Sequence, residues 1–205
     1  RCMAASAMIG VGNIDSIIEK IREEARKIVP GENLGAVINK ESQQRIEKYI
    51  TDAEQDGAVI LVDGRNTKVP GKENGTYVGP TVIDHVKPEM SVAREEIFGP
   101  VISIMRTNTV DEALAIENAN PYGNAASVFT QNGGMARYII ERASAGMIGV
   151  NVGVPVPREP FSFGGWNESK FGVGDITGKS SIEFWTKLKK STTKWNAEAG
   201  VNWMS

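Results

Sequence analysis

The stretch SAMIGVGNIDSIIEKIREEARKIVPG, residues 6–31, indicates the fold class of this chain. Its first part, 6–11, is mostly apolar and favours a strand. From about 13 to 28 apolar residues recur with the 3.6-residue period of one helix face, which predicts an amphipathic helix. Ser16 and Glu19 have capping-box spacing near its start. The residues of the predicted apolar face are Ile14, Ile17, Ile18, Ile21, Ala25 and Ile28.

The same alternation of strand and helix patterns continues along the chain. Thr109 and Glu112 have capping-box spacing and predict the start of one of the later helices. Alternating strands and helices predict an α/β fold with an open, largely parallel sheet flanked by helices. AVILVDG (58–64) is predicted as a buried strand, further strands are predicted at 80–86, 101–106, 125–130 and 147–151, and further helices at 41–56, 109–118, 134–145 and 178–185.

Composition excludes several classes of protein. The chain has 205 residues, 40% of them hydrophobic and 23% charged, and a net charge of −2, which is an ordinary globular mix. No block of lysine and arginine stands out and no apolar run approaches ~18 residues, so we expect neither a nucleic-acid partner nor a membrane. The single cysteine excludes an intrachain disulfide, fits a reducing compartment and leads us to expect a cytoplasmic protein.

Cys2 is the first candidate for chemistry. A thiolate is a strong nucleophile, and a neighbouring cation, here Arg1, lowers the pKa of a thiol. The alternative is a buried free cysteine that behaves as a small apolar residue. Since the chain starts at Arg1 without a methionine or a secretory leader, we expect it to be part of a longer polypeptide.

The motif EEIFGPV, residues 95–101, is the second candidate. It places two carboxylates and an aromatic side chain before a Gly-Pro turn and a predicted strand. A carboxylate there could accept hydrogen bonds from ribose hydroxyls, and the aromatic ring could pack on a planar ligand. The structural alternative is a charged helix end followed by a tight turn.

A glycine-rich loop, PFSFGGWNESKFG at 160–172, is the third candidate. Two phenylalanines beside paired glycines suit a backbone that passes close to a ligand or to another chain. The structural alternative is a hydrophobic plug within a glycine loop. His85 is the only histidine and lacks partners at metal-ligand spacing, so we expect no metal site. Gly10-Val11-Gly12 lacks the third glycine of a dinucleotide fingerprint.

Taken together and in order, four motifs resemble the catalytic half of the aldehyde dehydrogenase superfamily over essentially the whole chain. These motifs are RCMA (1–4), EEIFGPV (95–101), NPYGNAASVFT (120–130) and FSFGG (161–165). The arginine before the cysteine, NVGVPVPREPFSF (151–163) and GK-x-x-IEFWTKLK (178–189) are most similar to the methylmalonate (malonate) semialdehyde dehydrogenase branch. The run FGVGDITGKS (171–180) departs from the Gly-Arg-Glu string of many members, a departure that fits this branch.

This resemblance implies roles for individual residues. Cys2 matches the nucleophile, and Arg1 matches the branch's arginine for the substrate carboxylate, a task that suits the guanidinium fork. Glu96 matches the carboxylate that binds the nicotinamide-side ribose of NAD, and Phe98 the aromatic beside the nicotinamide. Phe163 matches the aromatic of the substrate funnel. The resemblance also implies that coenzyme A, as a co-substrate, takes the acyl group from Cys2.

The resemblance further implies a division of the chain. Residues 1–186 would be an N-terminally truncated catalytic domain, and 187–205 an oligomerisation strand, near 188–196, and a tail. The NAD-binding domain would lie in the absent N-terminal half, and the whole enzyme would be a homodimer or, as we expect, a homotetramer. Two alternatives stay open: a non-acylating dehydrogenase for another small acidic semialdehyde, with hydrolytic release, and an inactive fragment that serves only in assembly.

Overall fold

A four-stranded sheet forms the centre of the first part of the structure. The computed structural model describes residues 3–175 and 177–195, so Arg1 and Cys2 lie outside the described residues. The strands lie in the order β1 (Ala7–Val11), β4 (Val101–Thr107), β3 (Thr81–Asp84) and β2 (Val59–Val62). β4 pairs in parallel with both β1 and β3, and β2 joins the edge antiparallel to β3. The predicted open, largely parallel sheet is therefore confirmed.

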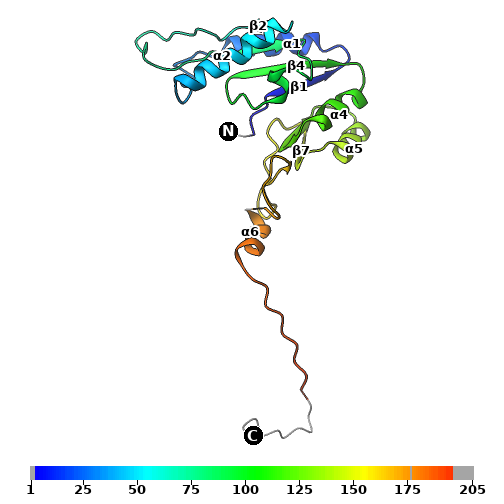
Figure 1. Cartoon of the computed structure of the whole chain (residues 1–205). Coiled ribbons are helices and arrows are strands. Elements are labelled where there is room, and N and C mark those ends of the chain that lie inside the picture. The colour runs from blue at the N-terminus through cyan, green and yellow to red at the C-terminus, as the bar shows by residue number, and fades with distance from the viewer. Residues whose placement is uncertain (1–2, 176, 196–205) are drawn as a thin grey trace.

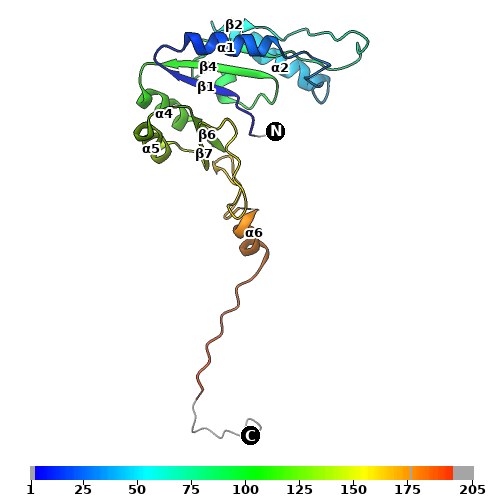
Figure 2. The same cartoon turned by 180° about the vertical axis from the view of Figure 1, so that it is seen from behind.

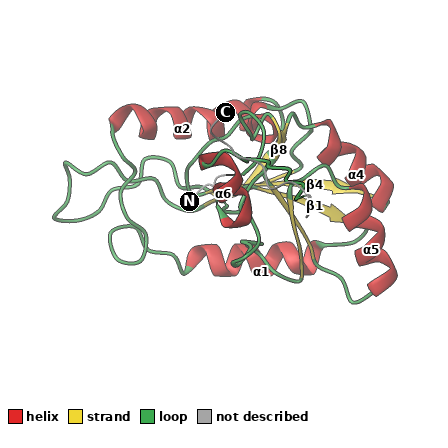
Figure 3. Ribbon diagram, turned by 90° about the horizontal axis from the view of Figure 1, so that it is seen from below, coloured by secondary structure: helices red, strands yellow, loops and turns green. Residues whose placement is uncertain are grey.

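Helices cover both faces of this sheet (Figure 3). On one face, α1 (Asp15–Arg26) packs Ile14 and Ile18 against Ile104. On the other, α2 (Lys40–Gln55) and α3 (Ser91–Arg94) form the larger apolar cluster. Consecutive residues of one strand point to opposite faces, so Val82 and Ile83 of β3 belong to different clusters.

The second part of the chain lies below this sheet in Figure 1. It consists of α4 (Val110–Ala119), β5 (Tyr122–Gly123), β6 (Ala125–Val128), α5 (Gly133–Arg142), β7 (Met147–Val150) and β8 (Trp166–Asn167). β6 and β7 pair in parallel, and β5 and β8 pair antiparallel. α6 (Gly178–Trp185) follows, and the chain then runs away from the body as an extended segment (Figures 1 and 2).

Three local expectations meet different outcomes. The Thr109–Glu112 capping box is present in full. The Ser16–Glu19 box is wrong, because α1 begins at the N-cap Ile14 without a side-chain cap and the Asn13 side chain instead accepts a hydrogen bond from the Asp15 amide. The strand in 58–64 is not buried: β2 is an edge strand.

The oligomerisation strand predicted near 188–196 lies partly outside the described residues, and its pairing with a second subunit stays a prediction. Residues 187–195 carry no strand as far as the structure describes them. An edge segment of this kind needs a partner strand to complete its backbone hydrogen bonds. The helix before it, α6, has no buried residue, and Ile182, Phe184 and Trp185 are exposed.

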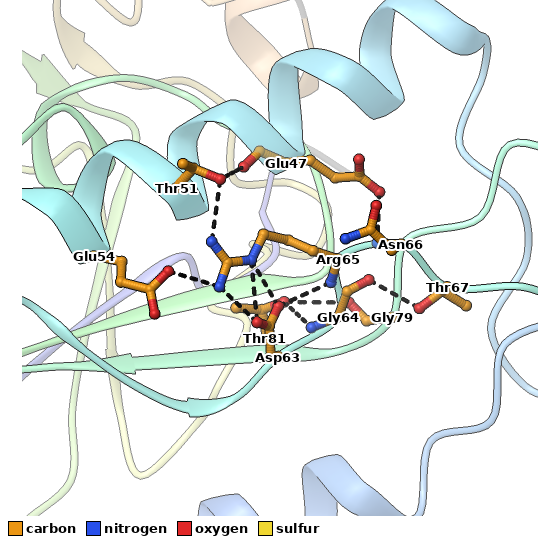
Figure 4. A network of polar contacts seen from close by, with 10 residues as sticks. All are labelled: Glu47, Thr51, Glu54, Asp63, Gly64, Arg65, Asn66, Thr67, Gly79 and Thr81. Atoms are coloured by element: carbon orange, nitrogen blue, oxygen red, sulfur yellow. Dashed lines mark hydrogen bonds and ion pairs between the residues drawn. The ribbon is translucent and has the colours of Figure 1, made fainter.

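Arg65 anchors the long excursion between β2 and β3 (Figure 4). Its guanidinium forms ion pairs with Asp63 at 2.6 Å and Glu54 at 2.8 Å and donates to the Thr51 hydroxyl at 3.1 Å. The hydrogen bond from Arg65 holds the pKa of Asp63 below its ordinary value. At the base of the excursion Gly79 donates its amide to the carbonyl of Gly64, so the two ends of the excursion meet. The loop between β2 and β3 is therefore closed at its base and held against α2 by Arg65.

Candidate active site

The segment 95–100 is a loop that packs against α2 and is hydrogen-bonded to it. Ile97 is buried in the larger core cluster and Gly99 packs directly on the side chain of Ile46, since a Cβ on Gly99 would lie 2.7 Å from Ile46 Cδ1. The Arg45 guanidinium donates to the carbonyl of Glu96 at 3.4 Å and to that of Ile97 at 2.8 Å. The Tyr49 hydroxyl donates to the Glu95 carboxylate. Side chains of one helix thus hold the Glu95 side chain and the backbone carbonyls of Glu96 and Ile97.

This anchoring turns two predicted cofactor residues outward. Glu96 and Phe98 are both exposed, and 59% of the Phe98 surface is accessible. Phe98 has a φ of +57°, a left-handed conformation that residues with a side chain seldom adopt. Such backbone strain gathers at functional sites and persists only where the surroundings impose it. The loop therefore presents a carboxylate and an aromatic ring from a fixed backbone, and both groups suit the ribose and nicotinamide of the expected NAD.

Phe163 lies in a different loop, which is tied to the start of α6. Its amide donates to the Thr177 hydroxyl at 2.7 Å, and the Ser162 hydroxyl is 3.0 Å from that of Ser180. Phe163 is partly buried. The glycines that follow are needed for packing within the chain, because a Cβ on Gly164 would lie 2.0 Å from an Asp175 carboxylate oxygen. These glycines thus pack closely on the protein's own residues, and the predicted approach to a ligand or another chain stays a prediction.

The segment 120–124 connects the two loops. Asn120 donates its side-chain amide to the carbonyl of Ala93 in α3, directly before the loop 95–100, at 3.3 Å. Tyr122 and Gly123 form β5 and pair with β8, which directly follows the Phe163 loop. Three motifs that are far apart in the sequence therefore form one connected set of backbone and side-chain contacts.

The start of the chain reaches the same segment. Asn124 donates its side-chain amide to the sulfur of Met3 at 3.3 Å, and a Cβ on Gly165 would lie 3.0 Å from the Cα of Asn124. β1 and β4 run parallel, so residues 3–6 before β1 and the loop 95–100 before β4 lie at the same end of the sheet. Cys2 and Arg1 fall outside the described residues, and their predicted roles stay predictions.

Sequence reasoning missed the supporting residues of this arrangement. Arg45 and Tyr49 lie four residues apart on α2, and their spacing was a detectable signal for a shared helix face. The partners of that face, the backbone carbonyls of 96 and 97, leave no mark in the sequence. Asn120 and Asn124 stood in a quoted motif, yet only the structure shows that they bind α3 and Met3.

The described residues hold no group of three or more histidine, cysteine, aspartate or glutamate side chains arranged for a metal ion. None of the helices within the described ranges is long and apolar enough to cross a membrane.

Comparison with known proteins agrees with the motifs. Residues 1–191 match the Aldehyde dehydrogenase family. The chain is 44% identical over 204 residues to the mitochondrial methylmalonate-semialdehyde/malonate-semialdehyde dehydrogenase [acylating] of Bos taurus, covering 97% of this chain and 38% of that protein. The chain thus spans well under half the length of this curated relative.

Two solved structures share the fold. The methylmalonate-semialdehyde dehydrogenase of Oceanimonas doudoroffii has a TM-score of 0.91 at 41% identity, over 96% of this chain and 42% of that one. A protein of Sinorhizobium meliloti 1021, solved in complex with NAD, has a TM-score of 0.92 at 38% identity, over 97% of this chain and 42% of that one.

Proposed function

Since the chain belongs to the aldehyde dehydrogenase family, we propose that it is the catalytic part of an NAD-dependent, CoA-acylating enzyme that oxidises methylmalonate or malonate semialdehyde. The supporting observation is the connected set of contacts that joins the start of the chain, the loop 95–100 and the Phe163 loop through residues 120–124. The resemblance to semialdehyde dehydrogenases favours this substrate class.

Cys2 is the proposed nucleophile. Its thiolate attacks the aldehyde carbon, and the new C–S bond converts the carbonyl oxygen to an oxyanion. Bound NAD would supply the hydride acceptor, and loss of hydride from that carbon would restore the C=O bond and leave an acyl thioester on Cys2. The coenzyme A thiolate then displaces the Cys2 sulfur, so an acyl-CoA leaves and the thiol is restored. Hydrogen-bond donors to the oxyanion would stabilise it, among them the Cys2 amide.

The remaining proposed residues bind and orient. Glu96 accepts hydrogen bonds from the ribose of NAD and Phe98 packs beside the nicotinamide. Arg1 pairs with the substrate carboxylate, and the two parallel hydrogen bonds of a guanidinium make that pairing directional. Phe163 lines the substrate path. The sequence is proposed to comprise a catalytic domain, 1–186, and an oligomerisation strand and tail, 187–205, with the NAD-binding domain in the rest of the enzyme.

Self-association is the proposed role of the C-terminal segment. The apolar side chains Ile182, Phe184 and Trp185 of α6 are exposed, and 187–195 is extended without a strand partner in the described chain, as expected if a second copy covers both. The sedimentation mass of the full-length protein with and without 187–205 tests this. We expect a dimer or tetramer that loses subunits on truncation, and an unchanged mass would contradict it. The cytoplasmic location stays a prediction.

Two other functions are distinguished from this proposal by different measurements, the dependence of turnover on coenzyme A and the effect of substitutions at Cys2. A non-acylating dehydrogenase would release a free acid through water, in which case omitting coenzyme A would not slow turnover. An assembly fragment would have no part in catalysis, so no substitution at Cys2 would affect the enzyme. The connected contacts among the motif loops favour the catalytic part over the assembly fragment.

Substitutions in the full-length enzyme test the proposal. Cys2→Ser is expected to lower NADH formation from semialdehyde at least ~1,000-fold, since a hydroxyl is a far weaker nucleophile than a thiolate at neutral pH. Arg1→Lys is expected to raise KM for carboxylated aldehydes much more than for neutral ones. Undiminished turnover in Cys2→Ser would reject the nucleophile, and an equal effect of Arg1→Lys on both substrates would reject the carboxylate contact.

A further inference from the structure

Three residues on adjacent turns of α2 hold the conformation of loop 95–100. Arg45, Ile46 and Tyr49 lie at helical spacing and contact the loop at its carbonyls, at Gly99 and at Glu95. Arg45 also lies over the Tyr49 ring, 5.8 Å from its centroid. We call Arg45 and Tyr49 the loop clamp.

Arg45 contacts the backbone directly before the strained residue. Its two donors reach the carbonyls of Glu96 and Ile97, the pair of peptide groups that precede Phe98. An arginine fork can hold two acceptors in a fixed plane, which a lysine ammonium cannot reproduce. These bonds restrict the backbone at the place where Phe98 takes its left-handed φ of +57°.

Tyr49 makes the two adjacent glutamates different, because it binds the carboxylate of Glu95. Its hydroxyl donates to the Glu95 side chain, and this hydrogen bond is the main reason that the pKa of Tyr49 lies above its ordinary value. Glu95 is thereby tied to α2, whereas the clamp contacts Glu96 at its backbone carbonyl and leaves its side chain exposed. Of these two neighbouring residues, Glu95 therefore anchors the loop to α2 and Glu96 has an exposed carboxylate that a ligand can reach.

We propose that Arg45 and Tyr49 are positioning residues that hold loop 95–100 ready for the cofactor, so that Glu96 and Phe98 are ordered before NAD arrives. The proposal rests on the proposed function, in which this loop binds NAD. A preorganised loop loses less conformational freedom on binding, so losing the clamp weakens NAD binding although neither side chain need touch NAD.

The test uses the full-length enzyme and four variants. Arg45→Ala and Tyr49→Phe remove the clamp, and both side chains are accessible enough for the fold to persist. The chain offers matched controls: Arg142 lies 3.9 Å from the ring centroid of Tyr138, whose hydroxyl donates to Asp111 at 2.6 Å. Arg142→Ala and Tyr138→Phe thus remove the same chemical groups from a different helix.

Three quantities are measured for each variant: the NAD dissociation constant without aldehyde, hydrogen–deuterium exchange of the 95–100 peptide without NAD, and kcat at saturating NAD. Arg45→Ala is expected to raise the NAD Kd about tenfold, the factor for one hydrogen bond to a charged group. Tyr49→Phe is expected to raise it about threefold. Both variants should exchange faster in 95–100 and keep kcat within about twofold, and the two controls should match the wild type.

Unchanged NAD binding in both clamp variants overturns the proposal, whether or not the loop exchanges faster. A parallel Glu96→Gln variant then shows how far the failure extends. If Glu96→Gln weakens NAD binding, the loop is the cofactor site and only the clamp is wrong. If Glu96→Gln also leaves the Kd unchanged, the loop is not the cofactor site and its place in the proposed function fails as well.

Discussion

At the scale of single residues, neighbours in the sequence have separate tasks. Glu95 is held by Tyr49 while Glu96 remains exposed, although sequence alone offers two equivalent carboxylates. Phe98 was a candidate because of its type, and the structure adds its strained φ of +57° and its exposure. Residue type therefore identified the candidates, and the contacts with α2 separate the anchored side chain of Glu95 from the exposed side chains of Glu96 and Phe98.

Asp84 supports a prediction of pH dependence. It lies at the end of β3, 4% exposed, and Arg106 of β4 binds both of its oxygens, at 3.0 and 2.8 Å. Burial opposes ionisation of Asp84, but hydrogen bonds from Arg106 and from the His85 amide hold its pKa below the ordinary 3.8. Because the folded-state pKa is the lower one, the stabilisation is complete above about pH 4 and is lost as pH falls through the folded value.

Asp84→Asn is therefore expected to lower the free energy of unfolding at pH 7 by about 1–3 kcal/mol and to reduce its decline between pH 5 and pH 2. Urea denaturation over that range measures both effects. As a control, Asp52→Asn removes an exposed partner of Lys48, and a loss under about 1 kcal/mol is expected. An acid decline as steep in Asp84→Asn as in the wild type would contradict this account.

At the scale of elements, periodicity and capping chemistry predicted most helices and strands. The amphipathic pattern located α1 and α2, and the Thr109 box located the start of α4. Two errors have the same physical cause. The first error is β2, which was predicted to be buried and is an edge strand. The second concerns Ile17 and Ile28, which were predicted to face the core but are exposed and line an apolar cavity of about 540 Å³ beside α1. In both cases the exposure depends on which neighbouring segments cover the residues. A local pattern contains no information about those neighbours.

Gly99 gives a prediction for the contact between the loop and α2. A Cβ there would lie 2.7 Å from Cδ1 and 2.9 Å from Cγ1 of Ile46, a side chain with no exposed surface. Gly99→Ala is expected to cost about 1–3 kcal/mol of stability through overpacking. Gly35→Ala is the control, because no atom lies within 4 Å of its added Cβ. Equal unfolding midpoints for the two variants would show that the loop does not pack as described.

At the scale of the whole molecule, sequence motifs identified the family but not how the motifs meet. Asn120 joins 120–124 to α3, β5 pairs with β8, and Met3 contacts Asn124. These long-range contacts follow from the parallel sheet and its loops, which single-sequence patterns do not specify. The extended C-terminal segment has the same explanation, since its proposed partner is a second chain.

Trapping the acyl intermediate tests the central claim most directly. Full-length enzyme is mixed with malonate semialdehyde and NAD without coenzyme A, quenched in acid, digested and examined by mass spectrometry. The account predicts an acyl adduct on the peptide that contains Cys2, formed together with one NADH per site, removed by added coenzyme A and absent from Cys2→Ser. NADH formation that leaves this peptide unmodified, or an adduct on any other residue, would contradict it.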